Sequence, residues 1–137
     1  MAQKLTATLT LSSTAGSTGA SNNIDIDLSV SDELTIVAPL QGLSTVIATA
    51  TGNETIIKPA GTATAYLYVK HTGTTDGTTA TAQLVDVEET GDAAFARLGA
   101  DEFMFIPFSH HAGSVGIQLH VQHASVVQME YAWFTKG

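Results

Sequence analysis

Four of the five histidines of this chain lie close together in the sequence, and histidine is a common ligand of Zn²⁺ and Ni²⁺. They are His110, His111, His120 and His123. The first two fall in an expected loop beside Gly113, whereas His120 and His123 differ by three positions on an expected strand and so face opposite ways. We therefore predict no metal or cofactor site within one copy. Only an oligomer axis that gathers histidines from three chains would create one.

Paired carboxylates are a second arrangement with chemical potential, because they can hydrolyse glycosides or bind Ca²⁺. Asp25 and Asp27 form such a pair, one residue apart, but strand alternation alone places both on the water-facing side. The adjacent acids at 88–89 and 101–102 fall at expected turns. We interpret all three as solvated surface rather than catalytic groups.

Sequence motifs for catalysis are also missing. The chain has no G-x-S-x-G nucleophile elbow, no P-loop, no G-x-G-x-x-G and no cysteine, and Ser109–His110 is only an adjacency in a loop. Five Lys and Arg residues offer few groups to stabilise an oxyanion or a phosphate. The expectation is a protein that is not an enzyme and carries no cofactor.

The elements that position these residues are expected to be strands, because apolar and polar residues alternate with period two along most of the chain. Leu5 to Leu11 and Ile24 to Val30 are clear examples, separated by a Ser/Gly-rich loop at 12–23. Further strands are expected at 34–37, 43–50, 55–58, 62–71, 79–88, 92–98, 102–108, 115–121 and 126–134. Within 79–88, Ala80, Ala82 and Leu84 are expected to share a face.

About ten strands without a helix predict an all-β fold, a single-domain antiparallel β-sandwich that is jelly-roll-like. The domain would span residues 1–137, with 1–23 as a strand plus a flexible Ser/Gly-rich arm.

Composition limits how this domain meets water. Hydrophobic residues make up 44% of the chain and charged residues only 13%, against about 25% charged in a typical soluble domain. The surface must therefore be covered by uncharged polar residues or be buried against other chains. The formal net charge of −8 disfavours contact with nucleic acid or with an anionic membrane, and no apolar run is long enough to span a bilayer.

Large apolar residues indicate where other chains would attach, although many of them also suit a core. All nine aromatic residues follow residue 65, residues 103–108 are apolar on both strand faces, and Trp133 and Phe134 must point to opposite faces. A strand that is apolar on both faces is usually central or covered by a neighbour. The candidate interface residues are Leu5, Phe103, Phe105, Phe108, Trp133 and Phe134.

Three short blocks resemble small structural proteins of tailed bacteriophages of marine and cyanobacterial type. Residues 66–73 (YLYVKHTG) resemble a YLYVKNTG strand and turn, and residues 95–103 (FARLGADEF) are similar to a FARLGPGEF turn. Residues 105–107 and 127–134 resemble the closing strands, so that the likeness covers about residues 24–135. His71 replaces Asn, and Ala100–Asp101 replaces Pro-Gly, which puts the shape of that turn in doubt.

The resemblance implies a virion structural protein, with a capsid decoration (cement) protein on the particle exterior as the leading expectation. Its partners would be copies of itself, with a homotrimer favoured, and the major capsid protein or other virion proteins. The alternative is a tail or fibre protein with a carbohydrate-binding role in host recognition, for which Tyr66, Tyr68 or Trp133 would supply an exposed aromatic platform.

Overall fold

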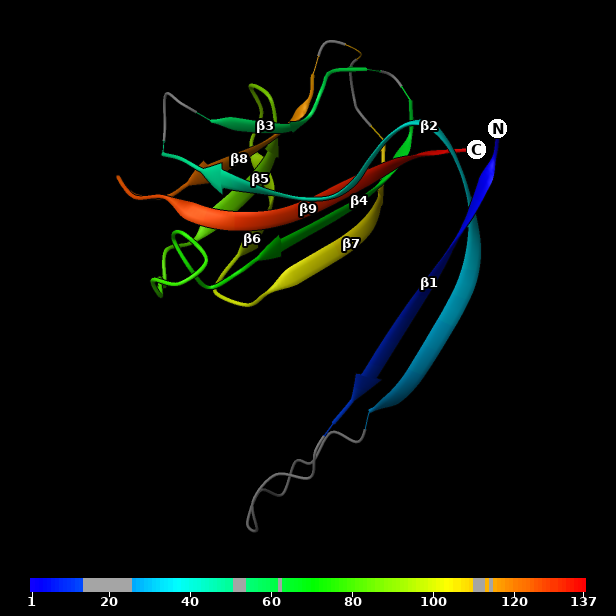
Figure 1. The fold of residues 1–137 in the computed structure, drawn as a ribbon, viewed down its shortest axis with the longest axis horizontal. Helices are drawn as coiled ribbons and strands as arrows, with labels where there is room; N and C mark the ends of the chain where they lie inside the picture. Colours follow the sequence, from blue (N-terminus) through cyan, green and yellow to red (C-terminus); the bar gives the residue numbers. More distant parts are fainter. Residues whose placement is uncertain (14–25, 51–53, 62, 110–112, 114) are drawn as a thin grey trace.

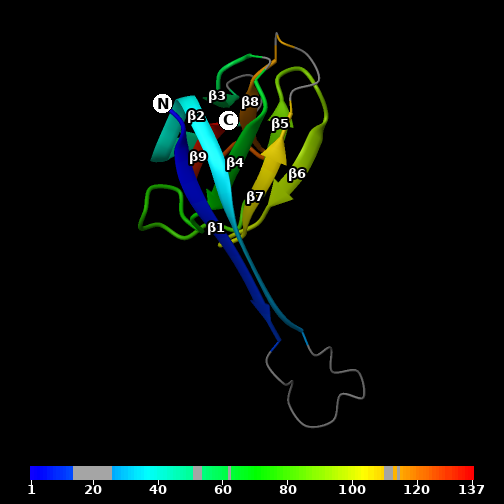
Figure 2. The same cartoon turned by 90° about the vertical axis from the view of Figure 1, so that its right-hand side faces the viewer.

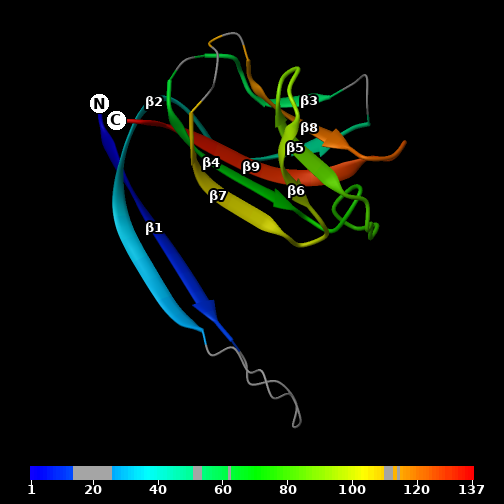
Figure 3. The same ribbon diagram turned by 180° about the vertical axis from the view of Figure 1, so that it is seen from behind.

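The computed structural model describes residues 1–13, 26–50, 54–61, 63–109, 113 and 115–137, and this part of the chain is all β. Its nine strands are β1 (Gln3–Ser12), β2 (Asp27–Ala48), β3 (Thr55–Lys58), β4 (Ala65–His71), β5 (Val85–Glu89), β6 (Ala94–Leu98), β7 (Phe103–Phe108), β8 (Ile117–Val121) and β9 (Val127–Lys136). They form two antiparallel sheets (Figures 1 and 3). The first sheet has the order β1-β2-β9-β4-β7, and the second has the order β3-β8-β5-β6.

The strand order is that of a jelly roll, as the sequence predicted. From β2 onward, four strands pair as β2-β9-β4-β7 and the other four as β3-β8-β5-β6, so the chain crosses repeatedly between two facing layers. Within the described residues there is no helix, and hence none that could cross a membrane.

Two details of the expected strand pattern were wrong. The segments expected at 34–37 and 43–50 belong, with residues 27–33, to the single strand β2, so nine strands are described instead of about ten. The strand expected at 79–88 begins only at Val85, and Val85 and Val87 enter the core while Leu84 is 41% exposed. The preceding residues belong to the loop after β4, where Asp76 and the threonines hydrogen-bond one another.

Strand β2 serves two partners because it bends. Its pairing with β9 shifts register between Val37 and Leu40 and again between Gln41 and Ser44, and extra residues of this kind bend and twist a strand. Residues beyond the bend pair with β1 instead, from Gln3 opposite Ile36 to Ser12 opposite Asp27. We call β1 together with residues 27–35 of β2 the arm, and it projects from the sandwich in two perpendicular views (Figures 1 and 2).

Both chain ends lie at the base of the arm (Figure 1), where the Gly137 amide donates a hydrogen bond to the Thr35 carbonyl at 3.0 Å. The Ser/Gly-rich segment that was expected to be flexible lies outside the described residues from position 14 onward.

The core lies between the two sheets. Its fully buried members include Leu67, Val69 and Met129 from the first sheet and Val85 and Leu119 from the second. A polar contact also joins the layers, since Trp133 of β9 donates its indole Nε1–H to the carbonyl of Ile57 on β3 at 3.1 Å. Trp133 is only 9% exposed, so its side chain packs within the core of its own copy.

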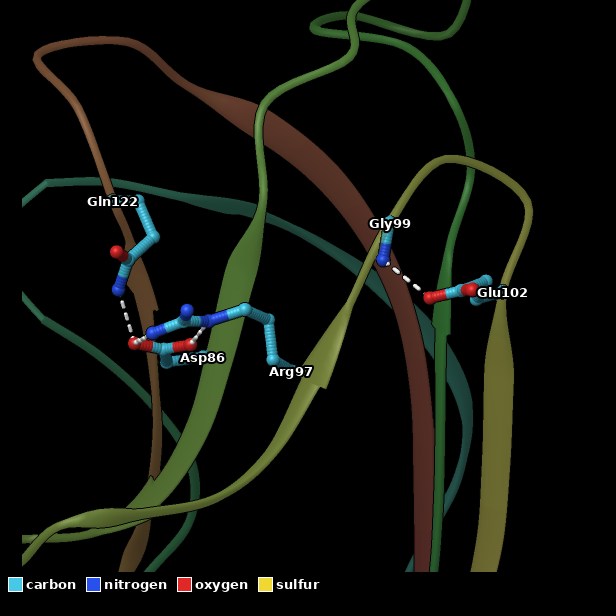
Figure 4. Close-up of polar contacts among 5 residues, drawn as sticks. All are labelled: Asp86, Arg97, Gly99, Glu102 and Gln122. Atoms are coloured by element: carbon cyan, nitrogen blue, oxygen red, sulfur yellow. Dashed lines mark hydrogen bonds and ion pairs between the residues drawn. The ribbon is translucent and has the colours of Figure 1, made fainter.

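The two departures from the phage sequence blocks have local structural roles. Asp101 takes a φ of 66°, in the left-handed region that Gly favours and that Asp tolerates better than most residues. In the same turn, the Gly99 amide donates to the Glu102 carboxylate at 2.6 Å (Figure 4). The fully buried His71 ring accepts the Gly73 N–H at Nδ1 and donates from Nε2 to the Gln83 carbonyl, at 2.9 and 2.8 Å.

The turn yields a first prediction. Because a left-handed conformation costs a side-chain-bearing residue roughly 1–2 kcal/mol, Asp101→Gly is expected to be more stable than Asp101→Ala by about 1 kcal/mol. Both variants lose the carboxylate, so their difference isolates the backbone effect. Urea unfolding curves of the two proteins measure it, and equal midpoints would contradict the proposed strain.

The Trp133 contact yields a second prediction. Trp133→Phe removes the donor to the buried Ile57 carbonyl and leaves a smaller ring, so the free energy of unfolding is expected to fall by about 1–3 kcal/mol. Urea titration followed by far-UV circular dichroism measures this, since the variant has no tryptophan to report on unfolding. The oligomeric state is expected to stay that of the wild type, and a change in mass would contradict the core assignment.

Candidate assembly interface

The outward side of the first sheet carries aromatic residues where an exposed sheet face would normally be polar. Along β4 the inward positions are buried, while Tyr66 and Tyr68 point outward and are only half-buried. Phe103 and Phe105 of β7 lie on the same outward side and are 61% and 38% exposed. We define the aromatic face as Tyr66, Tyr68, Phe103, Phe105, Pro107 and Phe134.

The aromatic face is ordered by contacts within it. The Tyr66 and Phe105 rings stack at 6.0 Å with an interplanar angle of 8°, and the Lys136 ammonium lies 5.0 Å from the Tyr66 ring centroid. At one margin Lys70 and Glu130 approach to 4.0 Å. Partial burial, followed by the Glu130 charge, raises the pKa of Tyr68 above its ordinary value. An apolar centre with a charged margin is typical of protein–protein interfaces.

A second apolar surface runs along one side of the arm. Pairing between β1 and β2 places alternate residues of both strands on that side, and we call this set the apolar arm face. Its apolar members are Leu5, Ala7, Leu9, Leu11, Leu28, Val30 and Leu34, and it also carries one charged residue, Asp32, opposite Ala7. Exposure increases away from the sandwich, since Leu5 and Leu34 are half-buried while Leu9, Leu11 and Val30 are 46%, 45% and 52% exposed.

The other side of the arm is polar. Thr8 and Ser31 face each other there with their hydroxyl oxygens 3.0 Å apart, and Lys4 pairs with Glu33 at 3.1 Å. Only one side of the arm therefore needs cover from water.

The aromatic face and the apolar arm face lie on the same side of the first sheet. Lys136 and Phe134 share the outward side of β9, and Ile36 pairs directly with Lys136. Opposed residues of an antiparallel pair point the same way, so Ile36, and with it Leu34 two residues earlier, faces that side too. The two surfaces are therefore continuous at the base of the arm.

The outward side of the second sheet is different, because polar side chains close it. Arg97 donates from Nε and an Nη atom to the two oxygens of the buried Asp86 carboxylate, at 2.6 and 3.2 Å, and Gln122 also donates to Asp86 (Figure 4). The Asp86 contacts raise the pKa of Arg97. Beside them Gln118 donates to Glu88 at 2.7 Å. This face also bears one exposed apolar residue, Ile56, but it has polar groups in most outward positions, whereas the outward side of the first sheet has aromatic rings.

One shallow hollow, of about 420 Å³, lies elsewhere on the sandwich and is lined by Glu89, Asp92, Phe95, Phe108 and Ser109 among others. The Phe95 and Phe108 rings stack along it at 5.4 Å. It adjoins Ser109, whose expected loop neighbour His110 lies outside the described residues.

The four histidines considered as metal ligands lie only partly within the described residues. His110 and His111 lie outside the described residues, His120 is half-buried on the outward side of the second sheet, and His123 is exposed in the following bend. Among the residues that the structure describes, no group of three His, Cys, Asp or Glu side chains is placed to hold a metal ion. Asp25 is not described, and Asp27 lies on the polar side of the arm.

The candidate interface residues separate into two groups. Phe103, Phe105 and Phe134 belong to the aromatic face, and Leu5 belongs to the apolar arm face. Phe108 packs inward against the core and Trp133 is buried, so neither forms part of these surfaces. Trp133 and Phe134 do face opposite ways, as their adjacency on a strand predicted.

Sequence reasoning missed the outer part of the arm. Apolar and polar residues alternate there as in an ordinary half-buried strand, with Leu9, Leu11, Leu28 and Val30 at the apolar positions. Nothing in the sequence indicated that, among the described strands, none would lie beside β1 to cover these residues.

The aromatic face gives the next prediction. Replacing two exposed rings, Phe103→Ser with Phe105→Ser, is expected to lower the oligomer mass while circular dichroism stays that of a folded β protein. Ile56→Ser is the matched control, because Ile56 is 58% exposed but lies opposite Gln118 on the second sheet. Light scattering after size exclusion measures the masses. An unchanged mass for the double variant would remove the aromatic face from the interface.

In comparisons with known proteins, no family model, no curated protein and no solved structure matches this chain. The phage resemblance stays a prediction that rests on the three sequence blocks quoted above.

Proposed function

We propose that this chain is a non-enzymatic structural subunit of a tailed-phage particle, and that it acts as a capsid decoration (cement) protein on the outer shell. The observation that carries the proposal is the contrast between the two outward sides of the sandwich. One side is closed by paired polar groups around Asp86, and the other presents exposed aromatic rings and an amphipathic arm. A subunit embedded on one side only has this distribution.

The proposed mode of action follows from that contrast. The second sheet would face solvent, while the aromatic face and the arm would lie against sister copies and shell subunits. Buried apolar area contributes about 25 cal/mol per Å² before the costs of association. Contacts that bridge neighbouring shell subunits would raise the barrier to their separation and so stabilise the particle.

Homo-oligomerisation is part of this proposal, with a trimer favoured. Closed cyclic symmetry lets every copy cover the same surfaces with one kind of contact. The net charge of −8 supports an exterior position, since an acidic subunit is repelled by nucleic acid.

A carbohydrate-binding tail or fibre protein is the second candidate, and the near-parallel Tyr66–Phe105 pair is the observation in its favour. Flat exposed rings suit the apolar faces of sugars. Trp133, which was considered for this platform, is buried and leaves the tyrosines and phenylalanines to form it. Strong, selective binding of the isolated chain on a glycan array would favour this candidate over the cement role.

The direct test is a mass measurement of the full-length chain, alone and after mixing with empty phage shells that lack a decoration protein. We expect a homo-oligomer that co-sediments with the shells and raises the temperature at which they disrupt. A monodisperse monomer that binds neither shells, tails nor itself would contradict the proposal.

A further inference from the structure

We propose that the arm of one copy packs its apolar face on the aromatic face of a second copy, as a third β layer on that copy's sandwich. The inference rests on the proposed function only in that both require a homo-oligomer. It adds which surfaces meet: each copy supplies an arm to a neighbour and an aromatic face on which a neighbour's arm packs.

The arm needs a cover that the described part of its own chain does not supply. A two-stranded ribbon is marginally stable in water at best, and three strands or a packed layer are needed to hold it. Here the large apolar groups of the arm beyond its base remain about half exposed: Leu9, Leu11, Leu28 and Val30. Among the described strands, β1 lies at the edge of its sheet and pairs only with β2.

The aromatic face has the same deficit. Phe103 is 61% exposed on β7, which is the other edge strand of the first sheet. The arm of the same copy runs away from the sandwich rather than across this face (Figures 1 and 2). Each copy therefore has one apolar ribbon side and one apolar sheet side, both uncovered.

A second copy fits this requirement better than another occupant, since both halves of the contact are present in every chain. The surfaces share one side of the sheet, so one docking movement can bring arm to face and face to arm together. The charges also fit: the apolar arm face carries Asp32, and the outward side that bears the aromatic face carries Lys136 as well as the Lys70–Glu130 pair.

The dimensions are sufficient for a stable contact. The ten paired residues of β1 span about 33 Å and the ribbon is roughly 10 Å wide, so one arm side covers about 300 Å². Two reciprocal contacts, with both partners counted, would bury about 1,200 Å², the lower limit for specific interfaces. If two copies place their arms on each other, they form a closed dimer. If each arm instead packs on the next copy, head to tail, the copies form a closed ring such as a trimer.

The test is complementation between two variants that are each defective in one surface. The arm variant carries Leu9→Ser and Val30→Ser, which oppose each other in the hairpin, and the face variant carries Phe103→Ser and Phe105→Ser. Each variant alone is expected to run with the mass of a single chain. Their mixture is expected to recover a larger species at high protein concentration, because the intact arm of one variant meets the intact face of the other.

The matched control is Thr8→Asn, on the polar side of the same arm, which is expected to keep the wild-type mass. If the mixture of the two defective variants forms no larger species, the arm of one copy does not pack on the aromatic face of another. Arms would then pair with arms, faces with faces, or both with another protein, and the inference is overturned. It is also overturned if the arm variant alone keeps the wild-type mass.

The outcomes separate this inference from the proposed function. A wild-type oligomer that shows complementation but ignores phage shells and tails would contradict the virion role and leave the arm contact standing. A wild-type oligomer that binds shells but forms without the arm would contradict the arm contact and leave the virion role standing. A wild-type monomer under all conditions would overturn both.

Discussion

The unequal cover of the two faces of the first sheet is the constraint on which the rest of this structure depends. The second sheet covers one face, and there Leu67, Val69 and Met129 are fully buried. Nothing within the described chain covers the other, although it carries phenylalanine and tyrosine rings at outward positions. A jelly roll that was complete in itself would place polar residues there, as this protein does on the far side of its second sheet.

The bend in β2 connects this constraint to assembly. Because extra residues interrupt the pairing with β9, the first half of β2 belongs to the arm and its second half belongs to the sandwich. On either side of the bend, Ile36 and Leu40 pair with Lys136 and Phe134, which are outward positions of β9. The outward side of the sheet therefore continues into the apolar arm face, and the arm extends this surface instead of covering it. A low content of charged residues, 13% of the chain, is consistent with a protein that keeps part of its surface away from water.

Much of the fold was predictable because strand alternation is a local property. Period two placed most strands, and the adjacency of Trp133 and Phe134 required one ring inside and one outside. Other features depend on contacts between distant residues. Whether Val85 or Leu84 enters the core depends on where the loop after β4 ends, and the sequence alone does not reveal that position. The inward placement of Phe108 and Trp133 was not predictable for the same reason, since exposure depends on which strands become neighbours.

The proposed interface was predictable in composition but not in shape. Two apolar faces at residues 103–108 indicated a need for cover, and in the structure β7 is an edge strand whose outward side chains remain exposed. The arm was harder to foresee because its sequence is that of an ordinary half-buried hairpin. Only the strand order shows that, among the described strands, no third strand pairs with the ribbon at β1.

Hydrogen–deuterium exchange at several protein concentrations tests most directly whether a sister copy covers these surfaces. We predict that amides of Gln3–Ser12 and Phe103–Phe108 become protected together as concentration rises, while those of Val85–Glu89 in the core stay equally protected throughout. Exchange in the arm and in β7 that is independent of concentration, over a range that includes the weakest association expected of such an interface, would contradict the account.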